Sequence, residues 1–249
     1  MPSSVYSNSQ QLSLIKTILT RYIRLPFTVS TIPGAIMEAV FAHVRGGRVL
    51  NTYDFVDVVK TTDRLGWQVK STKEGTPVTW KRAKIPNAEE LIARSRRSAA
   101  GRQRLGNAII DFCNQHALES LRTYELNQIG FARLIIHDDG SVTYFERLLC
   151  TRENPQVFDP QDFKWRWSTP KKTVKKEQLS ALHGIHRRTG KKWWAWHGLG
   201  ENQLHFSGEH NWWPKKNNGH ALTFRFPTED EKISLDGFLA LLERFDADN

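Results

Sequence analysis

The sequence predicts a mixed α/β (α+β) fold, in which a mixed central sheet is flanked by helices and followed by a β-rich C-terminal extension. Three observations predict it. The apolar residues recur at helical spacing in the first 45 residues, and they alternate with a period of two from about residue 49. The composition, with 39% hydrophobic and 25% charged residues in 249, is typical of a globular chain.

Two helices are expected at the start. Residues 9–24 place Leu12, Ile15 and Leu19 on one face, as an amphipathic helix requires. A second helix is predicted over 33–41, because proline favours a first helical turn and the Gly46-Gly47 pair follows its end.

Strands are expected next. Residues 49–59, 65–71 and 77–85 are rich in strand-forming residues and are separated by turn-like segments. A long helical segment over 87–118, interrupted near Gly101, follows them.

A hairpin completes the first region. Segments 131–136 and 142–145 flank the turn sequence Asp138-Asp139-Gly140. Three prolines within 151–176 then mark a boundary, so we expect a first domain over residues 1–150 and a second region over residues 151–249.

The second region is aromatic and basic. We expect a short helix over 179–185, strands around 193–196 and 203–206, and another over 222–226. A last helix should begin after Thr228 and bury an apolar stripe that consists of Leu235, Phe238, Leu239, Leu242 and Phe245.

The charge balance points to a polyanionic partner. The chain has 36 Lys and Arg against 26 Asp and Glu, a formal net charge of +10, and nine tryptophans. No apolar run approaches the roughly 18 residues of a bilayer span, so no membrane partner is expected. Two isolated cysteines, Cys113 and Cys150, are typical of the reducing cytoplasm.

One constellation of residues indicates chemistry. On the predicted strand over 65–71, Gln68 and Lys70 share a face, and a short turn brings an aspartate of the preceding segment beside them. Asp54 and Asp57 are three residues apart, so only one of them can join Lys70, and the local order of residues favours Asp54 with Asp57 as the alternative. Glu38 on the preceding helix can add a carboxylate. Such a group can hold Mg²⁺ and act on a phosphodiester.

At these residues the chain resembles the PD-(D/E)XK nuclease superfamily. The family core is a helix, a three-stranded meander, a helix and a further strand, and the predicted order over residues 30–150 matches it. The family motif maps to Asp54 (or Asp57), to Gln68-Val69-Lys70 and to Glu38. Gln68 stands where the family usually has an acid, which removes a negative charge from the metal site and makes Glu38 more valuable as a ligand.

The resemblance implies that residues 1–150 form a restriction-endonuclease-like nuclease core and that residues 151–249 form a DNA-recognition region with a C-terminal helix. It implies a Mg²⁺-dependent enzyme, a type II restriction endonuclease that acts as a homodimer on double-stranded DNA. It also implies a cognate DNA methyltransferase in the host. A repair or junction nuclease shares the same core and stays an alternative. A non-catalytic nucleic-acid-binding protein is the alternative from another class.

The expected DNA contacts lie in three groups: the end of the catalytic strand, the strand and helix after it, and the C-terminal loops. They are Ser71, Thr72, Lys73, Lys81, Arg82, Arg94, Arg96, Arg97, Lys191, Lys192, His210, Asn211, Lys215, Lys216 and Asn217. A weaker pattern, His197 with Asn211 and His220, is spaced somewhat like the His-Asn-His signature of ββα-metal nucleases.

Overall fold

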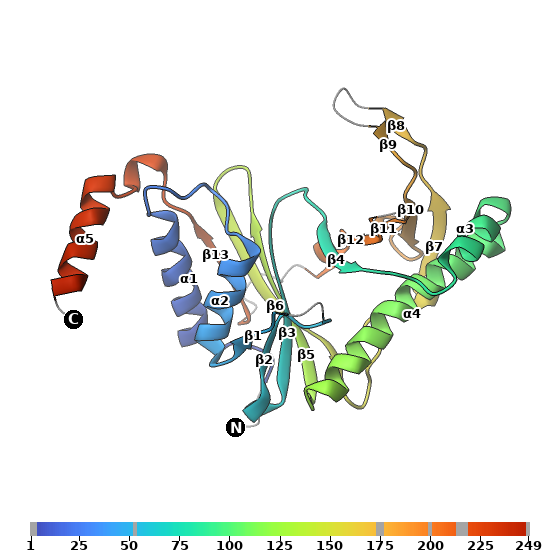
Figure 1. The fold of residues 1–249 in the computed structure, drawn as a ribbon, viewed down its shortest axis with the longest axis horizontal. Coiled ribbons are helices and arrows are strands. Elements are labelled where there is room, and N and C mark those ends of the chain that lie inside the picture. The colour runs from blue at the N-terminus through green and yellow to red at the C-terminus, as the bar shows by residue number, and fades with distance from the viewer. Residues whose placement is uncertain (1–3, 52–53, 173–176, 199–200, 213–218, 248–249) are drawn as a thin grey trace.

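Two main sheets form the framework of the fold, and different helices lie against each of them (Figure 1). The computed structural model describes residues 4–51, 54–172, 177–198, 201–212 and 219–247. The mixed α/β fold class is confirmed. None of the helices in these ranges is long and apolar enough to cross a bilayer.

The first two helices form much as expected. α1 (Ser9–Ile23) begins at a capping box between Asn8 and Gln11, and α2 (Gly34–Arg45) ends at Gly46. Gly46 has a φ of 64°, a left-handed conformation that glycine adopts without strain. Both helices lie on the same side of the first sheet (Figure 1).

The first sheet has six strands in the described ranges, in the spatial order β1-β2-β3-β5-β6-β13. All neighbours are antiparallel except β3 and β5, which are parallel. The strands are β1 (Arg48–Val49), β2 (Val58–Lys60), β3 (Leu65–Lys73), β5 (Gln128–Ile136), β6 (Ser141–Thr151) and β13 (Ala221–Arg225).

The second sheet is antiparallel throughout and has the order β4-β12-β11-β10-β7. Its strands are β4 (Val78–Arg82), β7 (Phe163–Trp167), β10 (Leu182–His186), β11 (Lys192–His197) and β12 (Gln203–Phe206). A short ribbon of β8 (Lys171–Lys172) and β9 (Glu177–Gln178) extends from it (Figure 1).

Two helices connect β4 to β5. α3 (Ala88–Arg97) and α4 (Ala99–Thr123) are separated at Ser98, whose backbone is extended and whose hydroxyl accepts a hydrogen bond from the Gly101 amide. A Cβ on Gly101 would lie 2.2 Å from the Arg94 carbonyl oxygen, so glycine allows the two helices to approach closely. The expected interruption near Gly101 is therefore real, and it begins three residues earlier.

The remaining elements of the described ranges are four short 3₁₀ turns and one longer helix. They are the 3₁₀ turns η1 (Thr61–Asp63), η2 (Pro160–Asp162), η3 (Glu209–Asn211) and η4 (Glu229–Glu231), and the last helix α5 (Leu235–Ala247).

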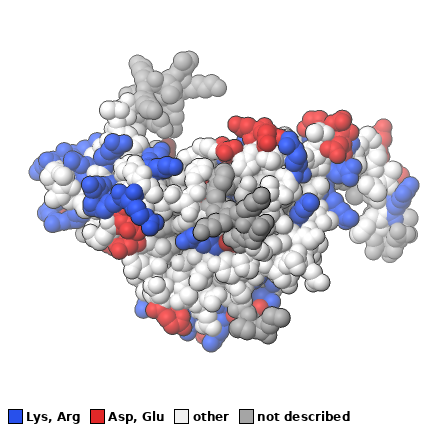
Figure 2. Space-filling model, turned by 180° about the vertical axis from the view of Figure 1, so that it is seen from behind, with Lys and Arg blue, Asp and Glu red and all other residues white. Residues whose placement is uncertain are grey.

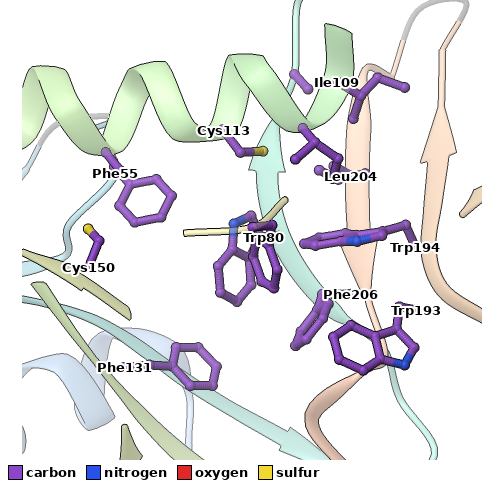
Figure 3. Close-up of a cluster of buried hydrophobic side chains, with 14 of the residues drawn as sticks. Phe55, Trp80, Ile109, Cys113, Phe131, Cys150, Trp193, Trp194, Leu204 and Phe206 are labelled. Atoms are coloured by element: carbon purple, nitrogen blue, oxygen red, sulfur yellow. The ribbon is translucent and has the colours of Figure 1, made fainter. Parts of the chain in front are cut away.

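An aromatic core joins the two sheets. Trp80 of β4 lies at its centre, with ring centroids 5.4 Å from Phe131 of the first sheet and 5.0 Å from Phe206 of the second (Figure 3). Trp194 and Phe158 pack against the same ring at 5.7 and 5.5 Å. Most of the C-terminal tryptophans thus serve the core rather than the surface.

A second core lies between the first sheet and helices α1 and α2. Trp67 and Val69 of β3 face it, together with Leu19 and Phe41 of the helices. Because side chains alternate along a strand, Gln68 and Lys70 of β3 face the opposite side, toward the aromatic core. This alternation sets the position of the candidate site.

Several expected elements differ in the structure. The strand expected over 49–59 is two short strands, β1 and β2, with a loop between them. The strand expected over 77–85 forms as β4, but it pairs with β12 in the second sheet rather than with β3. The helix expected over 179–185 is wrong: residues 182–186 form β10, because Leu182 and Gly184 are buried between two neighbouring strands.

The division at residue 150 does not coincide with the division between the sheets. β4 belongs to the second sheet although it precedes residue 150, and β13 returns to the first sheet although it follows it. The two sheets therefore exchange strands across the expected boundary.

The last helix also departs from expectation. Leu235 is 59% exposed and Phe245 is 68% exposed, and Leu239 and Leu242 are exposed as well. Only Phe238 of the expected stripe is half-buried, and it makes an edge contact with the exposed Phe27. The prediction of a buried stripe on α5 is wrong within this chain.

Burial of the two cysteine thiols leads us to predict how stability depends on pH. It raises the pKa of Cys113 and of Cys150 to about 12, and both are free thiols. Between about pH 9 and pH 12 the folded state therefore keeps protons that the unfolded state releases, so stability falls as pH rises through this window, by up to about 1.4 kcal/mol per thiol per pH unit. Urea unfolding of the parent and of the Cys113→Ala/Cys150→Ala variant at pH 8 and pH 10 measures this: the parent should lose more stability than the variant, and equal losses would contradict the prediction.

Candidate functional site

The centre of the site is an ion pair between adjacent parts of the first sheet. Lys70 Nζ lies 2.8 Å from Asp57 Oδ2, and the Val69 amide donates to the same oxygen at 2.8 Å. Both side chains are about one-fifth exposed, so the pair lies near the surface and is accessible to a ligand.

Strand register explains why Asp57 occupies this place. The ladder pairs Lys60 with Leu65 and Val58 with Trp67, and Asp57 directly precedes Val58, so Asp57 lies at the end of the ladder beside the segment from Gln68 to Lys70. The Asp57 amide donates to the Trp67 carbonyl at 2.8 Å, so Trp67, the partner of Val58 in the ladder, also holds the backbone of Asp57.

The preference for Asp54 over Asp57 is therefore corrected. Asp54 lies in the loop between β1 and β2, where its carboxylate accepts a hydrogen bond of 2.5 Å from the Tyr124 hydroxyl at the end of α4. Asp54 precedes the first residue of β2 by four positions, so the alternation of a regular strand does not govern where its side chain points.

Glu38 reaches the same region from α2. Burial raises its pKa, the negative charge of Asp57 raises it further, and the charge of Lys70 lowers it. The charges of Asp57, Glu38 and Lys70 thus influence one another where β3 extends past the first residue of β2.

Gln68 ties the site to the second sheet. Its Nε2 donates to the Trp80 carbonyl at 3.2 Å and to the Phe55 carbonyl at 3.4 Å. Its Oε1 is buried and accepts no hydrogen bond within the described part of the chain. An unpaired buried oxygen carries a free-energy cost that a cation or a donor would relieve.

These donors fit Mg²⁺ in kind. The described residues hold no group of three or more His, Cys, Asp or Glu side chains arranged for a metal, so a metal here would rely on the carboxylates of Asp57 and Glu38 and on the unpaired Gln68 Oε1. Carboxylate and amide oxygens are ligands that Mg²⁺ accepts.

A second lysine borders the site from β4. Lys81 is opposite Leu204 in the strand register, and burial lowers its pKa. The charges of Asp54 and Asp57 raise that pKa and the charge of Lys70 lowers it, so Lys81 belongs to the same electrostatic neighbourhood. His116 of α4 borders it too, because its pKa is lowered first by burial and then by Lys81.

Sequence reasoning missed Tyr124, His116 and Arg133. Tyr124 lies 70 residues and His116 lies 62 residues from Asp54 in the chain, and only the path of α4 brings them near, so no local pattern signals them. Arg133 lies next to Lys70 in the parallel register of β3 and β5 and is almost fully buried. Its guanidinium contacts Glu209 at 3.2 Å and donates to the Thr72 hydroxyl at 2.7 Å.

The expected DNA contacts fall into two separate places. Lys73 and His210 line a small hollow beside Arg133, together with Thr76 and Glu209. Ser71 and Thr72 lie on β3 nearby; the Ser71 hydroxyl is buried without a hydrogen-bond partner in the described ranges, and Thr72 is bound to Arg133. Asn211 is exposed beside His210 on η3.

The other expected contacts lie on the lobe that carries α3 and the second sheet. Arg82 is exposed at the end of β4, and Lys191 and Lys192 are exposed at the turn between β10 and β11. On α3, Arg94 pairs with Glu90, Arg96 stacks on Trp167 and Arg97 is exposed. Lys215, Lys216 and Asn217 lie outside the described residues.

The His-Asn-His pattern does not describe a site in the structure. His197 of β11 contacts the ring of His205 on β12, and His220 stacks on Tyr6 beside the first sheet. His197 and His220 thus contact different aromatic rings, one in the second sheet and one beside the first.

The chain was compared with protein-family models, with curated proteins and with solved structures, and none of them matches it.

Proposed function

We propose that the protein is a Mg²⁺-dependent DNA endonuclease whose site consists of Asp57, Lys70, Glu38 and Gln68. The observation that carries the proposal is the 2.8 Å ion pair of Asp57 and Lys70, which lies beside Glu38 on a sheet edge. An acid, an oxygen donor and a lysine on neighbouring strands are the groups that the PD-(D/E)XK resemblance calls for.

The order of elements supports the same proposal. Helix α2 precedes an antiparallel meander of β1, β2 and β3, and the long helix α4 then leads to β5, which is parallel to β3. Helix, meander, helix and further strand is the order of that family core. The member strands differ from those expected, because β4 leaves the meander for the second sheet.

The roles of the residues follow from their chemistry. Hydrolysis adds water across one phosphodiester bond, and negative charge increases on the phosphate oxygens in the transition state. Lys70, oriented by Asp57, presents an ammonium that stabilises this charge. Asp57, Glu38 and Gln68 Oε1 would hold Mg²⁺, which when bound supplies Lewis-acid activation of the phosphodiester.

We further propose a type II restriction role: a homodimer that acts on double-stranded DNA at a short specific site in the cytoplasm, with a cognate methyltransferase in the host. The two free thiols support a reducing compartment. A repair or junction nuclease with the same core, and a nucleic-acid-binding protein without catalysis, are the alternatives that the following experiment separates.

The test is digestion of unmethylated plasmid and phage DNA with Mg²⁺ or with EDTA, beside Lys70→Ala. We expect discrete fragments that require Mg²⁺ and are lost in the variant. Lys16→Ala is the matched control, because Lys16 is an exposed lysine on α1 that belongs to neither the proposed site nor the expected DNA contacts. A Mg²⁺-dependent smear would favour a repair nuclease, and binding without cleavage would overturn the enzyme proposal.

A further inference from the structure

The lobe formed by α3 and the second sheet carries a concentrated positive charge. Figure 2 shows Lys and Arg side chains gathered over this end of the molecule. Residues 88–97, 159–167 and 182–192 contain nine Lys or Arg against four Asp or Glu. We name the nine the basic lobe surface; they are Arg94, Arg96, Arg97, Lys164, Arg166, Arg187, Arg188, Lys191 and Lys192, and all are exposed.

The fold brings these residues together from three separate stretches of sequence. Arg166 of β7 lies opposite His183 of β10, and Lys164 lies opposite Ile185, so the strand pair presents both cations on one face. Arg187 donates to the Gln161 carbonyl at 2.8 Å, which ties the β10–β11 turn to the start of β7.

Helix α3 joins this surface through an aromatic contact. The Arg96 guanidinium lies 3.6 Å from the centre of the Trp167 ring, and the Trp167 indole donates to the Ser95 hydroxyl at 3.1 Å. Helix α3 is therefore held against the end of β7 by a cation–π contact and a hydrogen bond rather than by ion pairs with acidic side chains. Arg97 is exposed on the same helix.

The chemistry of the surface favours a phosphodiester backbone. Six of the nine cations are arginines, whose planar guanidinium binds phosphate oxygens through two parallel hydrogen bonds. Binding to an anionic membrane would call for exposed large apolar side chains among the cations. Most of the described ones lie elsewhere, on α1, on α5 and around Phe27 and Val29, and among them Leu179 alone adjoins the lobe.

We propose that the basic lobe surface is a nucleic-acid interface that binds the sugar–phosphate backbone through several phosphate contacts. It includes Lys164, Arg166, Arg187 and Arg188, which the sequence pattern did not single out. The inference deepens the proposed function, because it assigns backbone binding to the second sheet and α3, separately from the cleavage site on the first sheet.

The test measures binding in EDTA, so that it gives an answer whether or not the protein cleaves DNA. The variant replaces Lys164, Arg166, Arg188 and Lys191 with glutamine, and it spares Arg96 and Arg187 because they support the lobe. The control replaces Lys16, Arg21, Arg48 and Arg122 with glutamine. These four residues are exposed on α1, on β1 and at the end of α4, and their replacement removes the same charge as the lobe variant. Thermal unfolding checks that both variants are folded.

Fluorescence anisotropy with a 30-base-pair duplex, a single-stranded DNA and an RNA of equal length gives the dissociation constant from 50 to 200 mM NaCl. Each lost phosphate contact lowers the slope of log K against log salt by about 0.9 for duplex DNA. We expect the lobe variant to lose about 3 to 4 in slope and to bind on the order of tenfold or more weakly at 50 mM NaCl, while the control changes by less than one unit of slope.

Three results would overturn the proposal. They are equal slopes for the lobe variant and the control, a parent that binds none of the three nucleic acids at 50 mM NaCl, and a parent that prefers phosphatidylserine–phosphatidylcholine vesicles to the duplex. Failure of the proposed cleavage has a different signature, which is intact binding in EDTA and no Mg²⁺-dependent fragments. The three nucleic acids also show which source of phosphodiester the surface prefers.

Discussion

Asp57→Asn is expected to lower the rate of Mg²⁺-dependent DNA cleavage on the order of 10²–10³-fold, similar to the loss when one group that stabilises transition-state charge is removed from an active site. The substitution removes the charge that holds Lys70 at 2.8 Å and one carboxylate of the proposed metal site. Single-turnover cleavage of a plasmid at saturating Mg²⁺ measures it. Asp54→Asn should have a much smaller effect, because Asp54 is bound to Tyr124 rather than to Lys70.

A matched control separates the site from general electrostatics. Asp63→Asn removes a carboxylate that pairs with Lys60 at 2.8 Å in the turn between β2 and β3. It breaks an ion pair of the same kind on the same strand pair, and the stability cost of either substitution is about 0–1 kcal/mol because both pairs are partly exposed. An inactive Asp54→Asn beside an active Asp57→Asn would contradict the assignment.

Trp80→Ala is expected to lower the free energy of unfolding by about 3–5 kcal/mol, the usual cost of truncating a large buried aromatic side chain. Trp80 is 2% exposed and contacts rings from both sheets, so its loss leaves a cavity where the sheets meet (Figure 3). Urea unfolding monitored by circular dichroism measures the change.

Trp80→Phe tests whether packing or polarity matters at this position. The Trp80 indole Nε1 is buried without a hydrogen-bond partner among the described residues, so phenylalanine removes an unsatisfied donor while keeping an aromatic ring. We expect it to cost much less than alanine. Equal losses for the two variants would show that the ring contacts do not carry the stability. The Trp80 carbonyl accepts a hydrogen bond from Gln68, so we also expect Trp80→Ala to lower the cleavage rate. The parent and the variant are compared under conditions in which both are folded.

Local patterns in the sequence determined much of the first sheet and its helices. The spacing of Leu12, Ile15 and Leu19 predicts α1, and the Gly46-Gly47 pair predicts the end of α2. The alternation of β3, the hairpin of β5 and β6, and the pairing of Lys70 with an aspartate from the preceding segment also follow from sequence. These features depend on contacts between residues that are close in the chain.

Strand register decided which aspartate joins Lys70. The sequence shows that only one of Asp54 and Asp57 can do so, but the choice depends on where β2 begins, and β2 is only three residues long. A single strand over 49–59 and two short strands within the same segment would have similar residue patterns, since either is rich in Val, Phe and Tyr. The pairing of Val58 with Trp67 selects Asp57, and it can be read only from the folded sheet.

Long-range packing decided the rest. β4 has the alternation of a meander strand, yet it pairs with β12, more than 120 residues later, because Trp80 is buried among Phe131, Trp194 and Phe206. β10 has the apolar spacing of a short helix and becomes a central strand because β7 and β11 flank it. Sequence periodicity reports which faces of an element are apolar, whereas the partner that covers each face is set by the competition among all such faces in the folded chain.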